Sequence, residues 1–415
     1  MKQAFIFFLI FVLASAGLFS QELPEGGNRI TAISVSGLKR TKPYVIEKPL
    51  QIYIGRDAGS IDKNEIIATL KSTGIVEPLS VEIEDNADGG GKILAIIVKE
   101  KWAIIPLPFF SIGSGGWAVG GAFMDTNAFG IKDTMMLMGS YGSSSWMANV
   151  MYIHSPHVVG DFGWNLMGMF LSQDKENTDQ RDELTLRRYN SITINPSFGL
   201  SYKLTDLIMP SISVGYKNVM LRDTDSPVNA PEDGVQTISI SPGIGIIHNT
   251  WDGYFLNEKS ASLKYNYTLV VGDDDVHTVS LNAALTHSFI PGFRVTAKSG
   301  IIFATPSSSP FFESSPINAS VNILPQTYSA VDFSSLSLGL EKYLFKFKFG
   351  TVSISAGYQV VYSNGELLHN QFDHGPVAML QMYLSGIAIP GVGLGGAYNV
   401  DKNVWQYAFN VGMTF

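Results

Sequence analysis

The last eleven residues of the chain, 405–415, constrain its fold more than any other segment. Every second residue there is large and apolar: Trp405, Tyr407, Phe409, Val411, Met413 and Phe415. Successive side chains of a β-strand point to opposite sides, so this alternation predicts a strand with one apolar face. Its length matches the roughly 9–11 residues that a tilted strand needs to cross a bilayer. Aromatic residues near both ends are typical of the two membrane interfaces.

Shorter alternating segments recur upstream, at 191–195, 211–216, 237–241, 262–269 and 351–356. In each of them one face is apolar, and the other consists mostly of Ser, Thr, Asn and Gly. A soluble sheet would instead have a crowded buried face and a charged outer face. At roughly 20 residues per strand and loop, residues 102–415 predict an antiparallel transmembrane β-barrel of about 16 strands.

The composition agrees with a mainly β membrane protein. Only 15% of the residues are charged, whereas a soluble domain carries roughly 25%. Beyond the N-terminus there is no apolar run of about 18 residues, which argues against a bundle of membrane-spanning helices. A membrane barrel accounts for both observations, because only alternate residues of its strands face lipid.

Phe345 and Phe347 alternate with Lys346 and Lys348 in one of the later segments. A lysine on the lipid face at mid-bilayer costs about 2–4 kcal/mol. We therefore expect the phenylalanines to face lipid, and Lys346 and Lys348 to line a wet lumen.

Residues 1–20 have the layout of a secretory signal peptide. Lys2 precedes the apolar run 4–13, and small residues follow. This order is typical of a segment that is cleaved after export, here after Ala16 or Ser20. An uncleaved membrane anchor is the alternative. In either case the rest of the chain is expected to cross the inner membrane.

Residues 28–100 predict one small α+β domain. Ile30–Ser36 is a β-rich run, and Pro43 suits the first turn of a helix. Asp62 is a candidate N-cap for a second helix, which Gly74 is expected to end.

The second half of this domain predicts two strands. Leu79, Val81 and Ile83 alternate with polar residues, which indicates a half-buried strand, and 93–98 makes the return strand. The order strand, helix, helix, strand, strand resembles a POTRA domain, the polypeptide-transport-associated module. The segment 70–76 resembles that module's turn between its second helix and second strand. Another small α+β domain is the alternative.

A POTRA-like unit joined directly to such a barrel resembles the BamA/TamA family of outer-membrane assembly factors, also called the bacterial surface antigen family. The similarity covers nearly all of the chain after residue 20. It rests on the stretches Val98–Glu100, Gly120–Phe123, Asp125–Gly130, Asn249–Gly253, Leu336–Leu344 and the terminal strand. The last of these also resembles the C-terminal insertion signal of outer-membrane proteins.

The resemblance implies insertion of other β-barrels or movement of chains across the outer membrane, without enzymatic chemistry. In this mechanism the first and last strands pair weakly, and the open edge templates an incoming hairpin. Here that seam would join Pro106–Ile112, including Pro108 and Phe110, to Trp405–Phe415. The prolines remove hydrogen-bond donors from the first strand. Alternatively, they only mark the domain junction.

One departure from the family concerns a long inward loop. Family members carry an arginine-containing motif there, which pairs with acidic residues on the barrel wall. The corresponding stretch, Ser320–Pro325, has no arginine. Glu341 matches one acidic wall position, but Gln359 stands where the other is expected. Lys346 or Lys348 is the expected partner of Glu341, and a divergent member with altered activity is expected.

Other chemistries find little support in the sequence. The chain has no cysteine and a net charge of −8, so thiolate sites and binding to nucleic-acid phosphates are not expected. His154 and His157 are expected at loop ends rather than as a metal pair, and Asp273–Asp275 lacks calcium-loop spacing. No catalytic triad or phosphate loop is evident. We expect no enzyme, cofactor or metal.

The sequence thus predicts an outer-membrane protein whose POTRA-like domain lies in the periplasm. Its expected partners are outer-membrane lipids, unfolded outer-membrane proteins, and periplasmic chaperones or accessory lipoproteins. A passive channel or surface-exposed structural barrel is the alternative.

Overall fold

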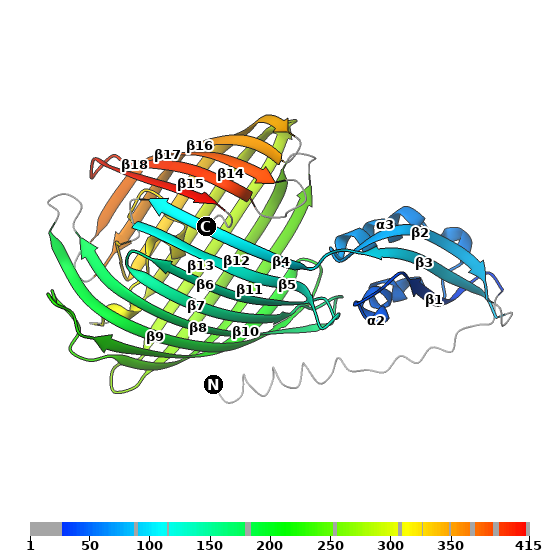
Figure 1. The fold of residues 1–415 in the computed structure, drawn as a ribbon, viewed down its shortest axis with the longest axis horizontal. Helices are drawn as coiled ribbons and strands as arrows, with labels where there is room; N and C mark the ends of the chain where they lie inside the picture. Colours follow the sequence, from blue (N-terminus) through cyan, green and yellow to red (C-terminus); the bar gives the residue numbers. More distant parts are fainter. Residues whose placement is uncertain are drawn as a thin grey trace. The chain divides into compact units, whose positions relative to one another are not determined.

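The computed structural model describes residues 27–86, 90–113, 116–178, 184–251, 255–305, 309–325, 327–347, 350–365, 370–384 and 390–411. The expected signal peptide, Lys348, Met413 and Phe415 lie outside the described residues. The chain divides into two compact units between Lys101 and Trp102, and each is described by itself (Figure 1).

The first unit is a small mixed α/β structure. Its elements are β1 (Ile30–Ser36), α2 (Pro43–Glu47), η1 (Lys48–Tyr53), η2 (Ala58–Ser60), α3 (Lys63–Ser72), β2 (Val76–Asp85) and β3 (Lys92–Glu100). The strands form a sheet in the order β1-β3-β2. β3 runs parallel to β1 and antiparallel to β2.

Local signals determine where these helices begin and end. Pro43 occupies the start of α2. The Asp62 side chain accepts a hydrogen bond from the backbone N–H of Asn64, so it caps α3 as expected. Gly74 has φ +78°, which ends the helix in the left-handed region. The apolar sides of the helices are buried in one core with alternate residues of the sheet, including Leu94 and Ile96.

Leu79 differs from the expectation. It was predicted to share a half-buried face with Val81 and Ile83, but its side chain is exposed. The register between β2 and β3 shifts between Pro78 and Ser80, as in a β-bulge. Such a shift turns the residue beside it to the other face.

A half-buried carboxylate, that of Glu100, joins the end of β3 to the turn before α2. Glu100 accepts hydrogen bonds from the Thr41 hydroxyl and from the backbone N–H groups of Lys39, Arg40 and Thr41. Burial alone would raise the pKa of Glu100, but these hydrogen bonds outweigh it and lower the pKa below its usual value.

The second unit is a closed antiparallel barrel of sixteen strands among the described residues. They are β4 (Ile104–Gly113), β5 (Gly116–Ala128), β6 (Asp133–Gly142), β7 (Ser145–His154), β8 (Phe162–Thr178), β9 (Thr185–Tyr202), β10 (Ile208–Arg222), β11 (Val235–Trp251), β12 (Leu256–Val270), β13 (Val276–Ile290), β14 (Phe293–Ala304), β15 (Asp332–Phe347), β16 (Gly350–Asn364), β17 (Gln371–Leu384), β18 (Pro390–Asn399) and β19 (Val404–Val411). The predicted fold class is therefore confirmed.

Each barrel strand pairs with its sequence neighbours, and β19 pairs with β4 to close the ring. Two short 3-10 helices, η3 (Pro310–Phe312) and η4 (Pro316–Ala319), lie between β14 and β15. We call the end of the barrel where β4 begins proximal, and the other end distal. None of the helices that the structure describes has the length and apolar character to cross a membrane.

Candidate functional site: a strand seam and an inward loop

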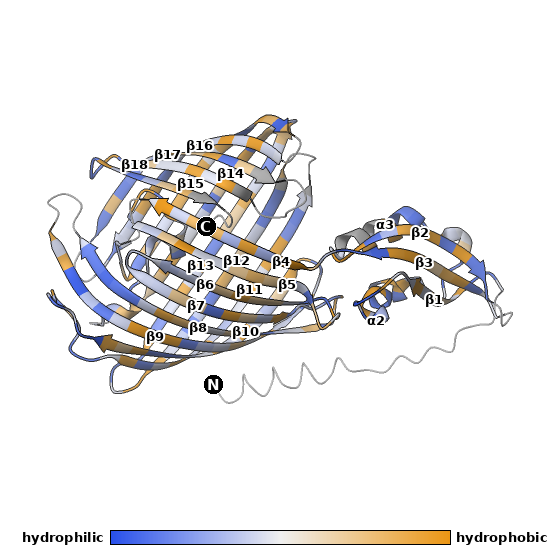
Figure 2. Cartoon of the chain, in the orientation of Figure 1, coloured by the Kyte–Doolittle hydropathy of each residue, from blue (hydrophilic) through white to orange (hydrophobic). Residues whose placement is uncertain are grey.

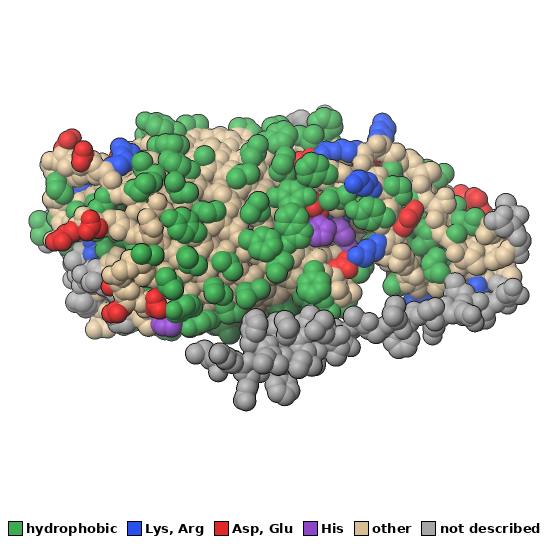
Figure 3. All heavy atoms as spheres, turned by 90° about the horizontal axis from the view of Figure 1, so that it is seen from below, with side chains coloured by type: hydrophobic (Ala, Val, Ile, Leu, Met, Phe, Trp, Pro, Cys, Tyr) green, Lys and Arg blue, Asp and Glu red, His purple; other side chains and the backbone are tan. Residues whose placement is uncertain are grey.

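The outer wall of the barrel is apolar and the inner wall is polar. On β10, the outward Ile212, Val214 and Tyr216 are exposed. On β9, the inward Ser191 and Thr193 are buried. The two kinds of side chain alternate along the strands (Figure 2). Apolar side chains spread over the side of the barrel, and charged ones gather toward the strand ends (Figure 3). This is the surface that a bilayer requires.

Aromatic pairs mark both ends of the apolar wall. Distal pairs are Trp117–Tyr141, Trp146–Phe170 and Tyr398–Trp405. Proximal pairs are Tyr152–Trp164, Phe162–Tyr202 and Phe289–Phe293. Such girdles sit at the headgroup level of a membrane.

The strands near the seam are the shortest. β4, β6, β7 and β18 each have 10 residues, and β19 has 8 among those described. By contrast, β8 to β13 have 15 to 18. At about 3.3 Å per residue and a tilt of about 40°, a 10-residue strand rises about 25 Å and a 16-residue strand about 40 Å. The paired strands beside the seam therefore span less height, and the longer strands β8 and β9 gain theirs in charged segments such as Asp174–Glu176 and Arg187–Arg188.

The seam joins the last barrel strand to the first. Among the described residues, β19 pairs with β4 at four positions only, from Phe110–Val411 to Gly113–Ala408. The opposite side of β4 pairs with β5 at ten positions. A Cβ on Gly113 would lie 2.4 Å from the Tyr407 carbonyl oxygen, so the two strands approach closely where they meet. Of the predicted partner stretch Trp405–Phe415, the residues from 412 on lie outside the described residues, and Trp405 and Tyr407 lie beyond the end of β4.

The four predicted seam residues of β4 lie on the same face of that strand. Pro106, Pro108, Phe110 and Ile112 point outward, while Leu107 and Phe109 are buried inside. Both prolines pair with β5, opposite Phe123 and Gly121. Proline has no N–H, so β4 offers fewer donors than a regular edge strand.

The segment between β14 and β15, residues 305–331, folds into the barrel. We call it the inward loop. A two-way backbone bridge between Ser314 and Ala330 closes it on itself. Its buried residues pack with the inner wall: Ala319, Val321, Ile323, Leu324, Tyr328 and Ala330 with Ile302, Phe333, Val361 and Ala397.

Gln359 of β16 anchors the tip of the inward loop. Its Oε1 accepts hydrogen bonds from the backbone N–H groups of Asn322 (2.7 Å) and Ile323 (3.3 Å). Its Nε2 donates to the Ser320 carbonyl at 2.8 Å. The side chain is fully buried. An amide can both accept and donate, so a single glutamine satisfies three backbone groups of the loop. In the family pattern, an arginine of the loop would meet an acid at this position.

The backbone of the inward loop lies very close to the barrel wall at Ala319. The Ser335 hydroxyl donates to the Ala319 carbonyl. A Cβ on Gly300 of β14 would come within 2.4 Å of that carbonyl oxygen and 2.5 Å of its carbon. Only glycine at position 300 lets the loop backbone lie directly on the strand.

The other side of the loop is held by the opposite wall. Arg187 of β9 donates to Glu313 of the loop at 2.9 Å, and both side chains are less than 5% exposed. The Ser329 hydroxyl donates to the same carboxylate. Lys217 of β10 donates to the Phe311 carbonyl at 2.9 Å. β9 and β16 lie seven strands apart in the ring of sixteen, so the loop crosses the lumen from wall to wall.

Glu341 has different partners from those expected. It accepts hydrogen bonds from Arg294 of β14 and from the Ser353 hydroxyl. Arg294 compensates the buried charge of Glu341, and Lys348 of the predicted pair lies outside the described residues. Lys346 lies opposite Thr351, on the face that carries the inward Ser353.

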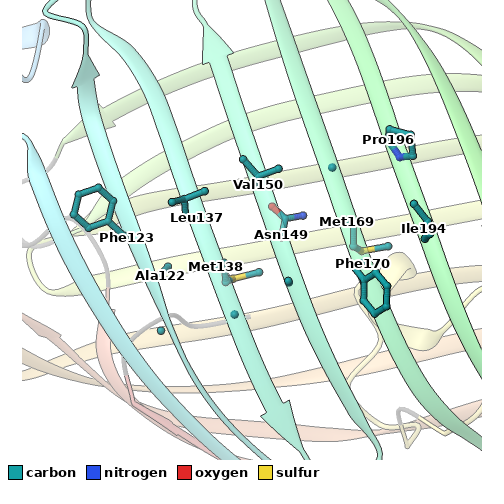
Figure 4. Close-up of a pocket in the computed structure, with 14 residues that line it drawn as sticks. Ala122, Phe123, Leu137, Met138, Asn149, Val150, Met169, Phe170, Ile194 and Pro196 are labelled. Atoms are coloured by element: carbon teal, nitrogen blue, oxygen red, sulfur yellow. The ribbon is translucent and has the colours of Figure 1, made fainter.

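A groove of about 740 Å³ lies on the outer wall across β5 to β9 (Figure 4). Its exposed floor consists of Gly121, Gly139 and Ala148, which share one row of the register. Phe123, Leu137, Val150, Phe170, Ile194 and Pro196 border it. The outer wall is thus poorly filled with side chains near the seam.

His154, His277 and His374 lie beside aromatic rings. His154 ends β7, lies 2.7 Å from an Asp133 oxygen, and has its ring 5.9 Å from that of His157. His277 and His374 stack beside Tyr265 and Tyr358. No group of three or more His, Asp or Glu in the described part of the chain could hold a metal ion.

Comparison with known proteins shows the fold. No family model matches the sequence, and no curated protein matches it. The structure is similar to BamA from Haemophilus ducreyi lacking POTRA domains 1–3, with 15% identity over 93% of this chain and 84% of that one and a TM-score of 0.62. It is also similar to CdiB from Escherichia coli, with 12% identity over 95% of this chain and 80% of that one and a TM-score of 0.67. CdiB from Acinetobacter baumannii is similar with 12% identity over 94% of this chain and 74% of that one and a TM-score of 0.63. The chain thus shares the barrel architecture of BamA and CdiB.

Proposed function

We propose that this chain is an outer-membrane assembly or translocation factor that offers the open edge of its first strand to a substrate strand. The meeting of the first and last strands at β4 and β19, with two prolines in β4 that remove backbone donors, carries the proposal. An edge strand with unpaired backbone groups adds another strand without any specific chemistry. The first unit, whose strand order is that of a POTRA domain, would lie in the periplasm and receive unfolded outer-membrane proteins.

The loosely filled outer wall beside the seam supports this function. Lipid packs poorly against a wall with few large side chains, which would lower the barrier for an entering hairpin. The groove at Gly121, Gly139 and Ala148 lies in the same part of the wall.

The inward loop argues against the passive channel. It crosses the lumen and is fixed to both walls, at Gln359 and at Arg187. A steady wide pore is therefore not expected from the native chain. A lumen crossed by the loop, beside a seam between the first and last strands, fits lateral delivery better than diffusion of solutes.

Locking the seam tests the proposal. The chain has no cysteine, and Ser111 and Asn410 are partners across the seam. Partner Cα atoms in antiparallel strands lie about 4.5–5.5 Å apart, within disulfide range. The double variant S111C/N410C should fail to restore other outer-membrane barrels in cells depleted of the native protein, and a reductant should restore them.

The matched control locks a pair away from the seam. Ser213 and Ser241 are partners on β10 and β11. The S213C/S241C variant should sustain normal barrel levels when oxidised. If the oxidised seam variant works as well as this control, the seam does not open. If depletion leaves other barrels at normal levels, the assembly role itself is wrong.

A further inference from the structure

A basic side chain interrupts the apolar outer wall near the proximal end. Lys259 of β12 is exposed and shares its face with the outward Leu263 and Tyr265. Its register partners are His248 of β11 and Leu285 of β13. It lies three residues after the start of β12 at Leu256, so the ammonium group is near the level of the lipid headgroups.

Two histidines accompany this lysine. His248 lies directly opposite on β11 and is exposed. His287 is the next outward position beyond Leu285, diagonal to Lys259 and also exposed. Diagonal neighbours on one face of a sheet are about 7–8 Å apart, within reach of long side chains. Lys259, His248 and His287 are therefore neighbours on the outer wall.

Within the described residues, Lys259 has no carboxylate partner. The adjacent Glu258 is on the inward face and accepts a hydrogen bond from Ser260. The other outward lysine of this wall, Lys342, lies over the Phe293 ring at 5.2 Å. A lysine at a membrane surface attracts anionic lipid, and its long stem can carry the charge to the interface.

A groove leads from Lys259 toward the middle of the wall. It has a volume of about 350 Å³ and is lined by Lys259 together with Ile246, Ala261, Ala283, Ser299 and Leu336. Ala261, Ala283 and Ser299 are successive partners in one row, so three small side chains form its floor. Eight of its lining residues are outward and the other three lie between them, so the groove opens to lipid and not to the lumen.

We propose that this is a binding site for an anionic phospholipid of the proximal leaflet. The phosphate would bind Lys259 between His248 and His287, and one acyl chain would lie over Ala261, Ala283 and Ser299. Charge complementarity selects this occupant, because the groove is apolar and its proximal end is basic. The site depends on the barrel lying in a membrane, but not on the assembly activity.

The test uses the full-length protein, extracted and analysed by native mass spectrometry with dioleoyl-phosphatidylglycerol and with dioleoyl-phosphatidylcholine. Wild type should retain phosphatidylglycerol preferentially. K259Q should reduce its retention about five-fold, the factor for one basic side chain at an anionic surface. A283L, which fills the groove, should reduce retention of the lipid while leaving the charge in place.

The matched control is K264Q, because Lys264 is on the same strand but alternates with the outward Leu263 and Tyr265. K264Q should retain lipid as wild type does. Equal retention by wild type and K259Q would overturn the proposal. It would also be overturned if inorganic phosphate alone bound with the same dependence on Lys259 and displaced the lipid, or if A283L had no effect. Thermal melting of each variant in detergent checks that the barrel is intact.

Discussion

Replacing Gln359 with leucine should release the inward loop from the wall. The substitution removes three hydrogen bonds, to the N–H groups of Asn322 and Ile323 and to the Ser320 carbonyl. At about 1 kcal/mol net for each bond, docking weakens by about 3 kcal/mol. Since 1.4 kcal/mol is a factor of ten, the undocked population should rise about 100-fold. Leucine fills nearly the same volume, so the barrel itself should remain folded.

The absence of native cysteine makes this population measurable. Val321 of the loop is 1% exposed, so V321C should react with a maleimide only when the loop undocks. Q359L in the V321C background should raise the labelling rate by about two orders of magnitude. Gln406 is another inward, buried glutamine, on β19, and Q406L should leave the rate unchanged. An unchanged rate in Q359L would show that this glutamine does not hold the loop.

Three further predictions concern the other contacts. E313Q removes the carboxylate that pairs with the buried Arg187, which should weaken docking of the inward loop by about 3–5 kcal/mol. Planar-bilayer recordings of E313Q should therefore show longer and larger openings. E176Q, in the exposed pair with Arg188, should change the recordings little. G300V places a side chain against the Ala319 carbonyl, so the loop should undock more often and V321C labelling should rise. G121A should not alter the labelling, because a Cβ at position 121 would be 3.9 Å from its nearest neighbouring atom. Equal labelling of V321C with and without G300V would show that close approach at Gly300 does not hold the loop. Because the folded-state pKa of Glu100 is lowered, its stabilisation is present at neutral pH and is lost as the pH falls through the folded value. Hydrogen exchange at Lys39–Thr41, corrected for intrinsic rate, should lose protection only as the pH falls below the ordinary glutamate pKa of about 4.3, and E100Q should abolish that dependence.

The features that could be predicted from the sequence are those that depend on residues close together along the chain. The alternation of Ile212, Val214 and Tyr216 predicted which face is apolar, because a strand has a period of two. Pro43, Asp62 and Gly74 act within a single helical turn. Leu79 was misplaced because a bulge changes the period locally, and nothing in the residues themselves marks it.

The contacts of the inward loop could not be predicted in the same way. Arg187 and Glu313 are 126 residues apart, and Arg294 and Glu341 are 47 apart. Which charges meet depends on the strand register and on the path of the loop. One signal was available: Lys217 is a cation within a segment that is otherwise poor in charge, and such a residue needs a partner. Gln359 was recognised as a replaced acid, but its bonds to the loop backbone follow only from the coordinates.

The central claim is that residues 102–415 form a barrel with its apolar face in lipid. Single cysteines from 263 to 268 on β12, spin-labelled in the protein reconstituted into vesicles, test it most directly. Collision with oxygen should be greatest at 263, 265 and 267, and collision with a water-soluble nickel complex should be greatest at 264, 266 and 268. Accessibility without this period of two, or with the two reagents exchanged, would contradict the account.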